Sequence, residues 1–544
     1  MKLKKLISVL LVLGMLFSMT ANITAAGLDD VRVEKNAKNV IIMIPDGTSM
    51  GGLTLARWYN GGGEFNLDSI ASGLVRTYSS DAPIADSAPA ATAMATGFKS
   101  HTGFIGVLPD ENTMPGLELL DLADKRKPVA TILEAAQLDG KATGVVATSE
   151  VMHATPAAFT AHDPSRANYD SISEQQVYQE LDVVISSGSK YFTSDVRGDK
   201  EDLISVLKSK YQYVTTPEEL NKVTSGKLWA MFAPAALDYD FDRDPNMQPS
   251  LAEMTKKAIN LLSQDKDGFF LIVEGSKVDW AAHANDPIGM ISDILAFDEA
   301  VGVALDFAKK DGNTMVIAAP DHGNSGITIG SKATDSNYDK TLLSSFIDPL
   351  KKAKLTGEGI EKMLNADRSN IVEIMATYYG ITDLTVEEIA AIKETKSGSM
   401  NKTVGPMIAK KANIGFTTNG HTGEDVPLYV YAPKGVDLLT GTVQNTDIAA
   451  YMEKAMGLDL VAVTDKLFIK ARSAFEAKGA AVVLDNTDPK NLVLIVKKGS
   501  TEIKMPVNKN IAYVNGTPVI LDGVVVFNGI YTYVPQSAVD LIKK

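Results

Sequence analysis

The stretch Asn39-Val40-Ile41-Ile42-Met43-Ile44-Pro45-Asp46-Gly47 decides the fold. Its first six residues form a short run rich in apolar and β-branched side chains, which is typical of a strand buried on both faces of a sheet. The Pro-Asp-Gly turn then ends the strand, so a carboxylate, that of Asp46, follows directly at its carboxyl end. The stretch predicts an interior strand of a parallel sheet that delivers a reactive side chain to the sheet's edge.

Two later stretches repeat this layout. The run Gly268–Val273 leads into Glu274, and the run Thr314–Ala319 leads through Pro320 into Asp321 and His322. Further strands are predicted over 142–147 and 428–431, and helices over 250–262, 291–309 and 446–456. Strands that alternate with helices predict an α/β fold with a doubly wound, mostly parallel central sheet flanked by helices. Ligands of such sheets bind beyond the carboxyl ends of the strands.

The pattern changes twice along the chain. Residues 330–413 form polar helices and loops, which we interpret as an insertion over the edge of the sheet. After residue 459, short strand candidates over 482–484, 492–496, 511–514 and 531–534 alternate with turn signals. We therefore predict a signal peptide over 1–26, a large α/β domain over 27–459 and a small C-terminal β-rich module over 460–544.

The first residues predict export. Three lysines within the first five residues precede an apolar run over 6–17, and the small residues of Ala21–Gly27 suit signal peptidase. The run is too short for a membrane span, and no later segment is apolar enough for one. The chain has no cysteine, which excludes a lipid-anchored cysteine, disulfides and thiolate metal ligands. We expect a secreted or extracytoplasmic protein without a lipid anchor.

The net charge of −14 and the pI near 5.1 argue against nucleic acid as a partner. The segment Ala85–Gly97 nevertheless indicates an anion site. Asp86 and Ser87 precede an alanine-rich helical run that Gly97 ends, which places Ser87 at a helix N-terminus. Free amides and the helix dipole favour a bound phosphate there. A plain helix cap is the alternative interpretation of Asp86 and Ser87.

Histidines and carboxylates indicate a metal centre. Asp279 and His283 are four residues apart, so a helix would place both on one face. Asp321-His322 offers adjacent ligands at a strand end, and His421 lies in a glycine-flanked loop. Imidazole and carboxylate are the ligands that zinc takes when thiolates are absent.

Six segments together resemble the signature segments of bacterial alkaline phosphatases, over about residues 39–458. They are Pro45-Asp46-Gly47, Asp86-Ser87-Ala88, the run 153–158 with Arg166, the run Glu274–His283, Asp321-His322 and the run His421–Asp425. The resemblance implies metal-dependent hydrolysis of phosphate monoesters through a phosphoserine intermediate at alkaline pH, with two Zn²⁺ and one Mg²⁺ per subunit. It also makes small-molecule phosphate monoesters the expected substrates. Family members are often homodimers, and the sequence leaves the oligomeric state open.

The resemblance also implies the roles of individual residues. Ser87 would be the nucleophile, Arg166 would grip the phosphate and Asp86 would orient Arg166. The implied ligand sets are Asp279, His283 and His421 for one zinc; Asp46, Asp321 and His322, with Ser87, for the second; and Thr155, Glu274 and the bridging Asp46 for magnesium.

Two positions depart from some family members. His153, the remaining residue expected at the third metal, stands where they carry aspartate, which puts magnesium at that site in doubt. Trp280 replaces a lysine of the same members, so we expect weaker retention of phosphate. We assign no ligand role to His162 or His101.

Two alternatives accompany this interpretation. A sulfatase or phosphodiesterase of the same superfamily is one, but Ala91 replaces the arginine of the sulfatase Ser-x-Pro-x-Arg segment. A secreted metal-binding protein would need neither Ser87 nor Arg166.

The C-terminal region resembles the copper amine oxidase N-terminal module at Val514–Asp522, Asn528-Gly529 and Tyr533-Val534-Pro535. A plain β-rich appendage is the alternative interpretation. Contact with the cell surface through this module is a hypothesis.

Overall fold

The computed structural model of the chain describes residue 28 and residues 31–543. A central sheet has the strand order β14-β2-β13-β8-β1-β7-β3-β4-β6-β5. Within the described residues, β13 runs antiparallel to both of its neighbours, and the other strand pairs of this sheet are parallel. The bounds are β1 Asn39–Pro45, β2 Ala71–Arg76, β3 Ala142–Glu150, β4 Val183–Ser187, β5 Gln212–Val214, β6 Leu228–Met231, β7 Phe269–Gly275, β8 Thr314–Ala318, β13 Val426–Tyr431 and β14 Gly441–Gln444.

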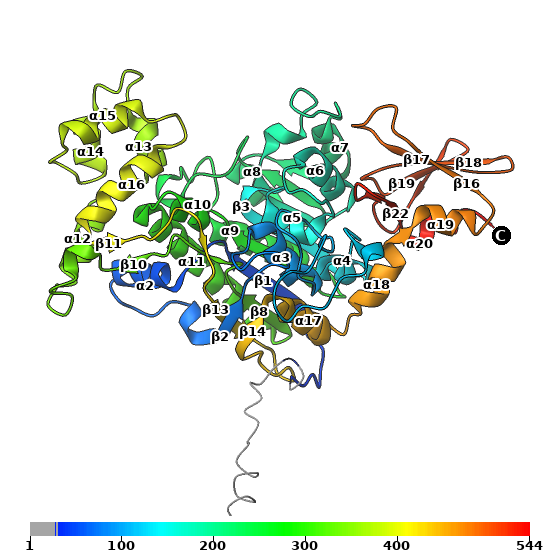
Figure 1. Cartoon of the computed structure of the whole chain (residues 1–544), viewed down its shortest axis with the longest axis horizontal. Helices are drawn as coiled ribbons and strands as arrows, with labels where there is room; N and C mark the ends of the chain where they lie inside the picture. Colours follow the sequence, from blue (N-terminus) through cyan, green and yellow to red (C-terminus); the bar gives the residue numbers. More distant parts are fainter. Residues whose placement is uncertain (1–27, 29–30, 544) are drawn as a thin grey trace, which may run out of the picture.

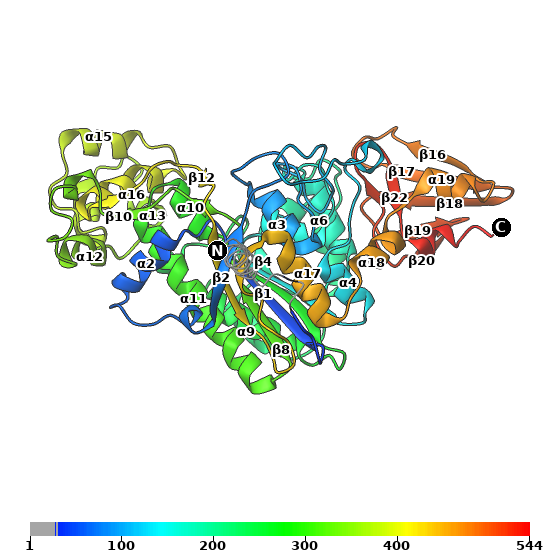
Figure 2. The same ribbon diagram turned by 60° about the horizontal axis from the view of Figure 1, so that its bottom comes forward.

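Helices cover both faces of this sheet (Figures 1 and 2). Ile41 and Met43 of β1 belong to one hydrophobic core, whereas Val40 and Ile42 belong to the other. This alternation follows from the two-residue period of a strand whose two faces are both buried. The first core packs against α2 (Met50–Tyr59), α9 (Leu251–Leu262) and α11 (Pro287–Asp311), and the second against α3 (Ser87–Thr96), α4 (Ile132–Leu138), α5 (Ala154–Thr160) and α17 (Asn445–Met456).

The predicted α/β class and its mostly parallel sheet are confirmed, and most predicted elements lie within two or three residues of their observed bounds. The helix predicted from residue 291 begins earlier, at Pro287, because proline fits the first turn and Asp286 caps it through a bond from the Ile288 amide. Short strands of the C-terminal region were not predicted from the sequence, among them β18 (Thr501–Pro506) and β20 (Thr517–Ile520).

The segment interpreted as an insertion contains five helices at one end of the molecule (Figure 1). They are α12 Ser344–Lys351, α13 Gly357–Met363, α14 Ile371–Tyr378, α15 Val386–Glu394 and α16 Met400–Lys411. Residues of α13 and α16 join the first core, so this helical insertion packs onto the α/β domain. Figure 2 shows it on the opposite side of the sheet from the C-terminal strands.

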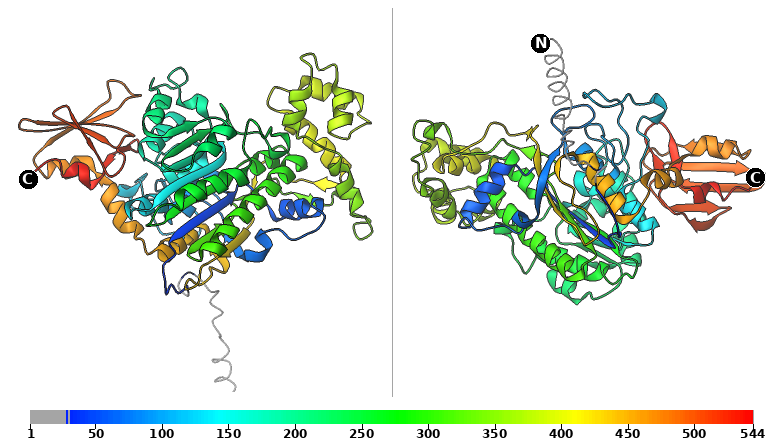
Figure 3. Two further views of the ribbon diagram at one scale, coloured as in Figure 1. Left: turned by 180° about the vertical axis from the view of Figure 1, so that it is seen from behind. Right: turned by 90° about the horizontal axis from the view of Figure 1, so that it is seen from below.

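The C-terminal region has its own core and sheets (Figure 3). Five antiparallel strands follow the order β16-β17-β18-β19-β20, and β15-β22-β21 form a second, three-stranded sheet. The remaining bounds are β15 Ile469–Lys470, β16 Ala481–Asp485, β17 Val493–Lys498, β19 Ile511–Val514, β21 Val526–Phe527, β22 Thr532–Val534, α18 Leu460–Leu467, α19 Ala471–Glu476 and α20 Gln536–Val539. The expected β-rich character is confirmed.

The predicted signal peptide lies outside the described residues. Within residue 28 and residues 31–543, no helix combines the length and the apolar character needed to cross a membrane.

Candidate active site

The carboxyl ends of neighbouring strands bring the predicted ligands together. Asp46 follows β1, Glu274 is the last residue but one of β7, and Asp321 and His322 follow β8. These three strands are adjacent in the sheet. Asp46, Asp321 and His322 are fully buried and their ligand atoms lie within 4.8 Å of one another. This first group (the β1–β8 group) has the composition of a metal site built from carboxylates and imidazole.

A second group forms beside it. Asp279 and His283 lie on α10 (Lys277–His283), with Asp279 Oδ2 3.4 Å from His283 Nε2, and His421 completes the group (the α10 group). His283 Nε2 lies 3.1 Å from His421 Nε2. Nδ1 of His283 faces the Asn419 carbonyl (2.6 Å) and Nδ1 of His421 faces the Ala85 carbonyl (2.7 Å), so each ring can donate from Nδ1 and keep its Nε2 lone pair for a cation. Gly47 permits this packing because its φ is +64° and an added Cβ would lie 2.5 Å from Asp279 Oδ1.

Ser87 lies against the β1–β8 group. It is the first residue of α3, its side chain is buried, and its Oγ is 3.0 Å from His322 Nε2. Asp86 precedes the helix but does not cap it through its side chain. Instead, Asp86 forms an ion pair with Arg166 and accepts a bond from the Gly103 amide. The alternative of a plain helix cap therefore does not describe Asp86.

A third group contains Asp46, His153 and Glu274. Hydrogen bonds from Ser149 (3.0 Å) and Ser276 (2.6 Å) hold one oxygen of Glu274, while its other oxygen has no partner. The Thr155 hydroxyl is buried nearby, also without a partner. Burial raises the pKa of Glu274 to about 7.

His153 has two competing uses. Its Nε2 lies 3.2 Å from Arg166 Nη2, and burial, with the charge of Arg166, lowers its pKa to about 4. A neutral imidazole has one lone pair, and an arginine can only donate. If that lone pair accepts from Arg166, the other ring nitrogen carries a proton and cannot bind a cation. His153 thus serves either Arg166 or the third group at any one time.

The buried polar atoms fit cations. Both oxygens of Asp46 and Oδ2 of Asp321 are buried without a hydrogen-bond partner. Burial, together with the charges of Asp321, Asp279 and Glu274, raises the pKa of Asp46 well above its usual value. Such a cluster is costly unless positive charge compensates it. The three groups therefore have the chemistry of metal sites.

Every predicted site residue thus lies in or beside one of the three groups. His162, to which no ligand role was assigned, has other partners: its Nε2 is 2.9 Å from Glu134 Oε1 and its Nδ1 is 2.7 Å from the Gly106 carbonyl. Three supporting residues were not predicted from the sequence: Asn324, which donates to Asp279 Oδ1 (2.7 Å), and the two serines that hold Glu274. Asn324 lies three residues after Asp321, and this proximity was the available signal.

Comparison with known proteins gives two family matches. Residues 37–458 match the model described as alkaline phosphatase, which agrees with the extent of the resemblance, and residues 452–541 match that of the copper amine oxidase N-terminal domain. The chain is 36% identical over 438 residues to Alkaline phosphatase 4 of Bacillus subtilis, covering 77% of this chain and 88% of the relative.

Solved structures of similar proteins include two informative ones. The Thermus thermophilus alkaline phosphatase has a TM-score of 0.69 at 25% identity, covering 81% of this chain and 95% of that one. A TAB5 alkaline phosphatase variant, with one histidine replaced by aspartate and magnesium in its M3 site, has a TM-score of 0.56 at 28% identity, covering 78% and 99%.

Proposed function

Because the chain belongs to the alkaline phosphatase family, a family of metal-dependent hydrolases, we propose that it cleaves phosphate monoesters through a phosphoserine on Ser87 and releases inorganic phosphate at alkaline pH. One observation carries this proposal: Ser87 Oγ, at the start of α3, lies 3.0 Å from His322, in a group where both oxygens of Asp46 and Oδ2 of Asp321 are buried without a hydrogen-bond partner. A structural metal site would not need a buried serine at this position.

The ligand sets proposed for two Zn²⁺ are the α10 group and the β1–β8 group with Ser87. When bound, these ions supply Lewis-acid chemistry that lowers the pKa of a serine hydroxyl and neutralises charge on the attacking and leaving oxygens. Asn324 would orient Asp279 as a ligand.

The protein's own residues then carry the reaction. Ser87 Oγ forms a bond to phosphorus while the bond to the ester oxygen breaks, and the alcohol leaves with a proton. Water next attacks the phosphoserine, which yields phosphate and restores the serine hydroxyl. Arg166 binds two non-bridging oxygens through its planar fork, and Asp86 holds that guanidinium in place.

The third group, with Asp46, Thr155, Glu274 and His153, is proposed to take Mg²⁺. The lone-pair conflict at His153 weakens this site. Support comes from the TAB5 enzyme, in which a histidine-to-aspartate variant holds magnesium in the M3 site.

The proposal extends to the whole chain. We assign residues 1–26 to a signal peptide, 27–459 to the catalytic domain and 460–544 to an accessory module, and we expect a secreted enzyme. The match to the copper amine oxidase N-terminal domain supports a separate module. Cell association that persists after deletion of residues 479–544 would refute a role in surface contact.

The test is phosphate release from p-nitrophenyl phosphate at alkaline pH, with Zn²⁺ and Mg²⁺, after EDTA, and with Ser87→Ala. We expect both EDTA and the substitution to reduce the rate by about 10³-fold or more, with metal content retained in the variant. Parallel assays with bis(p-nitrophenyl) phosphate and p-nitrophenyl sulfate test the other superfamily activities. Preference for either ester, or unchanged activity in Ser87→Ala, would overturn the proposal.

A further inference from the structure

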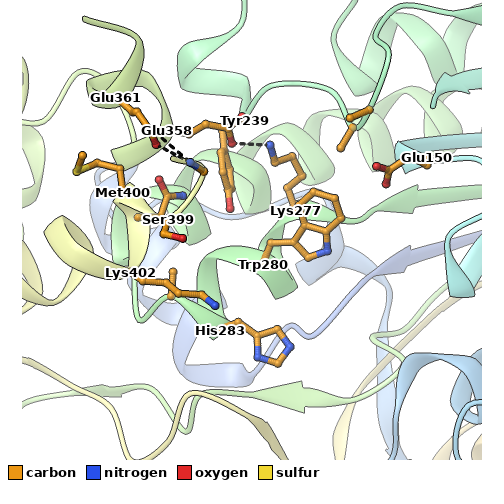
Figure 4. Close-up of a pocket in the computed structure, with 15 residues that line it drawn as sticks. Glu150, Tyr239, Lys277, Trp280, His283, Glu358, Glu361, Ser399, Met400 and Lys402 are labelled. Atoms are coloured by element: carbon orange, nitrogen blue, oxygen red, sulfur yellow. Dashed lines mark hydrogen bonds and ion pairs between the residues drawn. The ribbon is translucent and has the colours of Figure 1, made fainter. Parts of the chain in front are cut away.

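A cleft of about 630 Å³ opens beside the α10 group (Figure 4). One wall comes from α10 and its surroundings, including Lys277, Trp280 and His283, and the other from the helical insertion, including Glu358 and Lys402. The cleft therefore lies between two segments that are far apart in the sequence. Its volume suits an organic group much larger than a methyl or ethyl alcohol.

The position of the cleft indicates which part of the substrate it would hold. In an in-line displacement the leaving oxygen lies opposite the attacking one. Ser87 lies against the β1–β8 group, so the leaving oxygen would lie on the side of the α10 group. His283 belongs to that group and also lines the cleft. The organic part of the ester would consequently extend into the cleft.

The charged side chains on the two walls of the cleft differ in whether they already have a partner. Lys277 Nζ lies 2.9 Å from Glu358 Oε2 and donates to the Leu237 carbonyl, so this pair is internally satisfied. Glu361 accepts two bonds from the Gly398 amide. Lys402 is exposed, and within the described residues no carboxylate pairs with its ammonium group. Figure 4 shows Glu150 on the other side of Trp280 from Lys402.

Resting on the proposed function, we propose that this cleft binds the leaving group and favours aryl phosphates whose ring carries an anionic substituent. The indole of Trp280 offers the ring an apolar surface beside His283. Lys402 supplies the cation for the substituent, and because no carboxylate competes for it, the interaction costs no existing ion pair.

The experiment compares 4-carboxyphenyl phosphate with the nearly isosteric, neutral 4-carbamoylphenyl phosphate. Values of kcat/KM are measured for the metal-loaded wild type and for Lys402→Met. Expressing each value as variant over wild type removes the intrinsic difference between the two leaving groups. Lys410→Met is the matched control, because Lys410 is an exposed lysine of the same helix that does not line the cleft.

We expect Lys402→Met to lower kcat/KM for the carboxylate up to about fivefold, the upper end of the range for one exposed ion pair, and to change the amide by less than twofold. Lys410→Met should alter neither ratio, and 0.5 M salt should reduce the effect. Equal changes on both substrates, or none, would overturn the inference while leaving the proposed function intact. A wild type that cleaves neither ester would instead refute the proposed function.

Discussion

The side chain of Asn508, in the C-terminal region, accepts a hydrogen bond of 3.3 Å from Gln175 Nε2 on α6 (Tyr169–Tyr178). Gln175 in turn accepts from the His162 amide (2.8 Å) and donates to the His162 carbonyl (3.0 Å). His162 lies four residues before Arg166. The C-terminal region therefore braces the segment that carries the proposed phosphate-binding arginine.

Removing this brace should weaken phosphate binding more than the chemical step. We expect Asn508→Gly to raise KM about threefold, with kcat within twofold of wild type, because Arg166 would be less well positioned. Glycine suits this site, where φ is +68°. The matched control is Asn515→Gly, at another left-handed asparagine (φ +50°) in the distant β19–β20 turn. An unchanged KM, or an equal change in the control, would contradict the prediction.

Metal removal should reverse the effect of one substitution on stability. In EDTA, Asp46→Asn should raise the melting temperature, because burial and neighbouring carboxylates disfavour the charge of Asp46. With Zn²⁺ present, the same change should lower the melting temperature, since a ligand is lost. Thermal melts of both proteins in both conditions measure this, and the same sign in the two conditions would refute it.

The conflict at His153 predicts tighter magnesium binding in His153→Asp. An aspartate has two oxygens and a negative charge, so one oxygen can accept from Arg166 while the other faces a cation. We expect the concentration of Mg²⁺ that half-activates the enzyme to fall about tenfold. His153→Asn, similar in size but uncharged, is the control, and equal Mg²⁺ dependence in the two variants would count against the argument.

His162 should stabilise the fold at lower pH. Burial alone would lower its pKa, but the charge of Glu134 and two hydrogen bonds outweigh burial and raise it. The pKa of His162 is therefore higher in the folded state than in the unfolded state. Its contribution to the free energy of unfolding is complete below the ordinary pKa near 6.5 and is lost as pH rises through the raised pKa.

The corresponding variant is His162→Gln, which keeps a donor towards Glu134 without the charge. We expect wild type to melt about 2 °C higher than the variant near pH 6, and the difference to shrink toward pH 9. Circular dichroism melts at fixed metal concentration provide the measurement. A difference that grows with pH would show that the sign is wrong.

Trp280→Lys should strengthen product inhibition. Trp280 lies on α10 between two ligands, and its ring meets the His153 ring edge-on at 5.7 Å. A lysine there would add a cation near the phosphate site. We expect the inhibition constant for inorganic phosphate to fall severalfold at constant metal content, and an unchanged constant would refute the idea.

The sequence by itself determined the strands that carry the site. The β-branched runs that end at Asp46, Glu274 and Asp321 could be recognised because a strand buried on both faces needs continuous apolar residues. The position of Ser87 at a helix start followed from local signals as well, namely Pro89 in the first turn and Gly97 at the end. The resemblance to the family supplied the proposed ligand sets, whose members lie together in the structure.

Only the tertiary structure decided how distant segments meet. Three features join residues whose local sequences give no sign of each other. They are the Lys402 side of the cleft, the hydrogen bond between Asn508 and Gln175, and the contact of His153 with Arg166. The short strands β18 and β20 also escaped recognition. The physical reason is common to these cases: local propensity fixes strands and helix ends, whereas side-chain contacts across domains depend on packing.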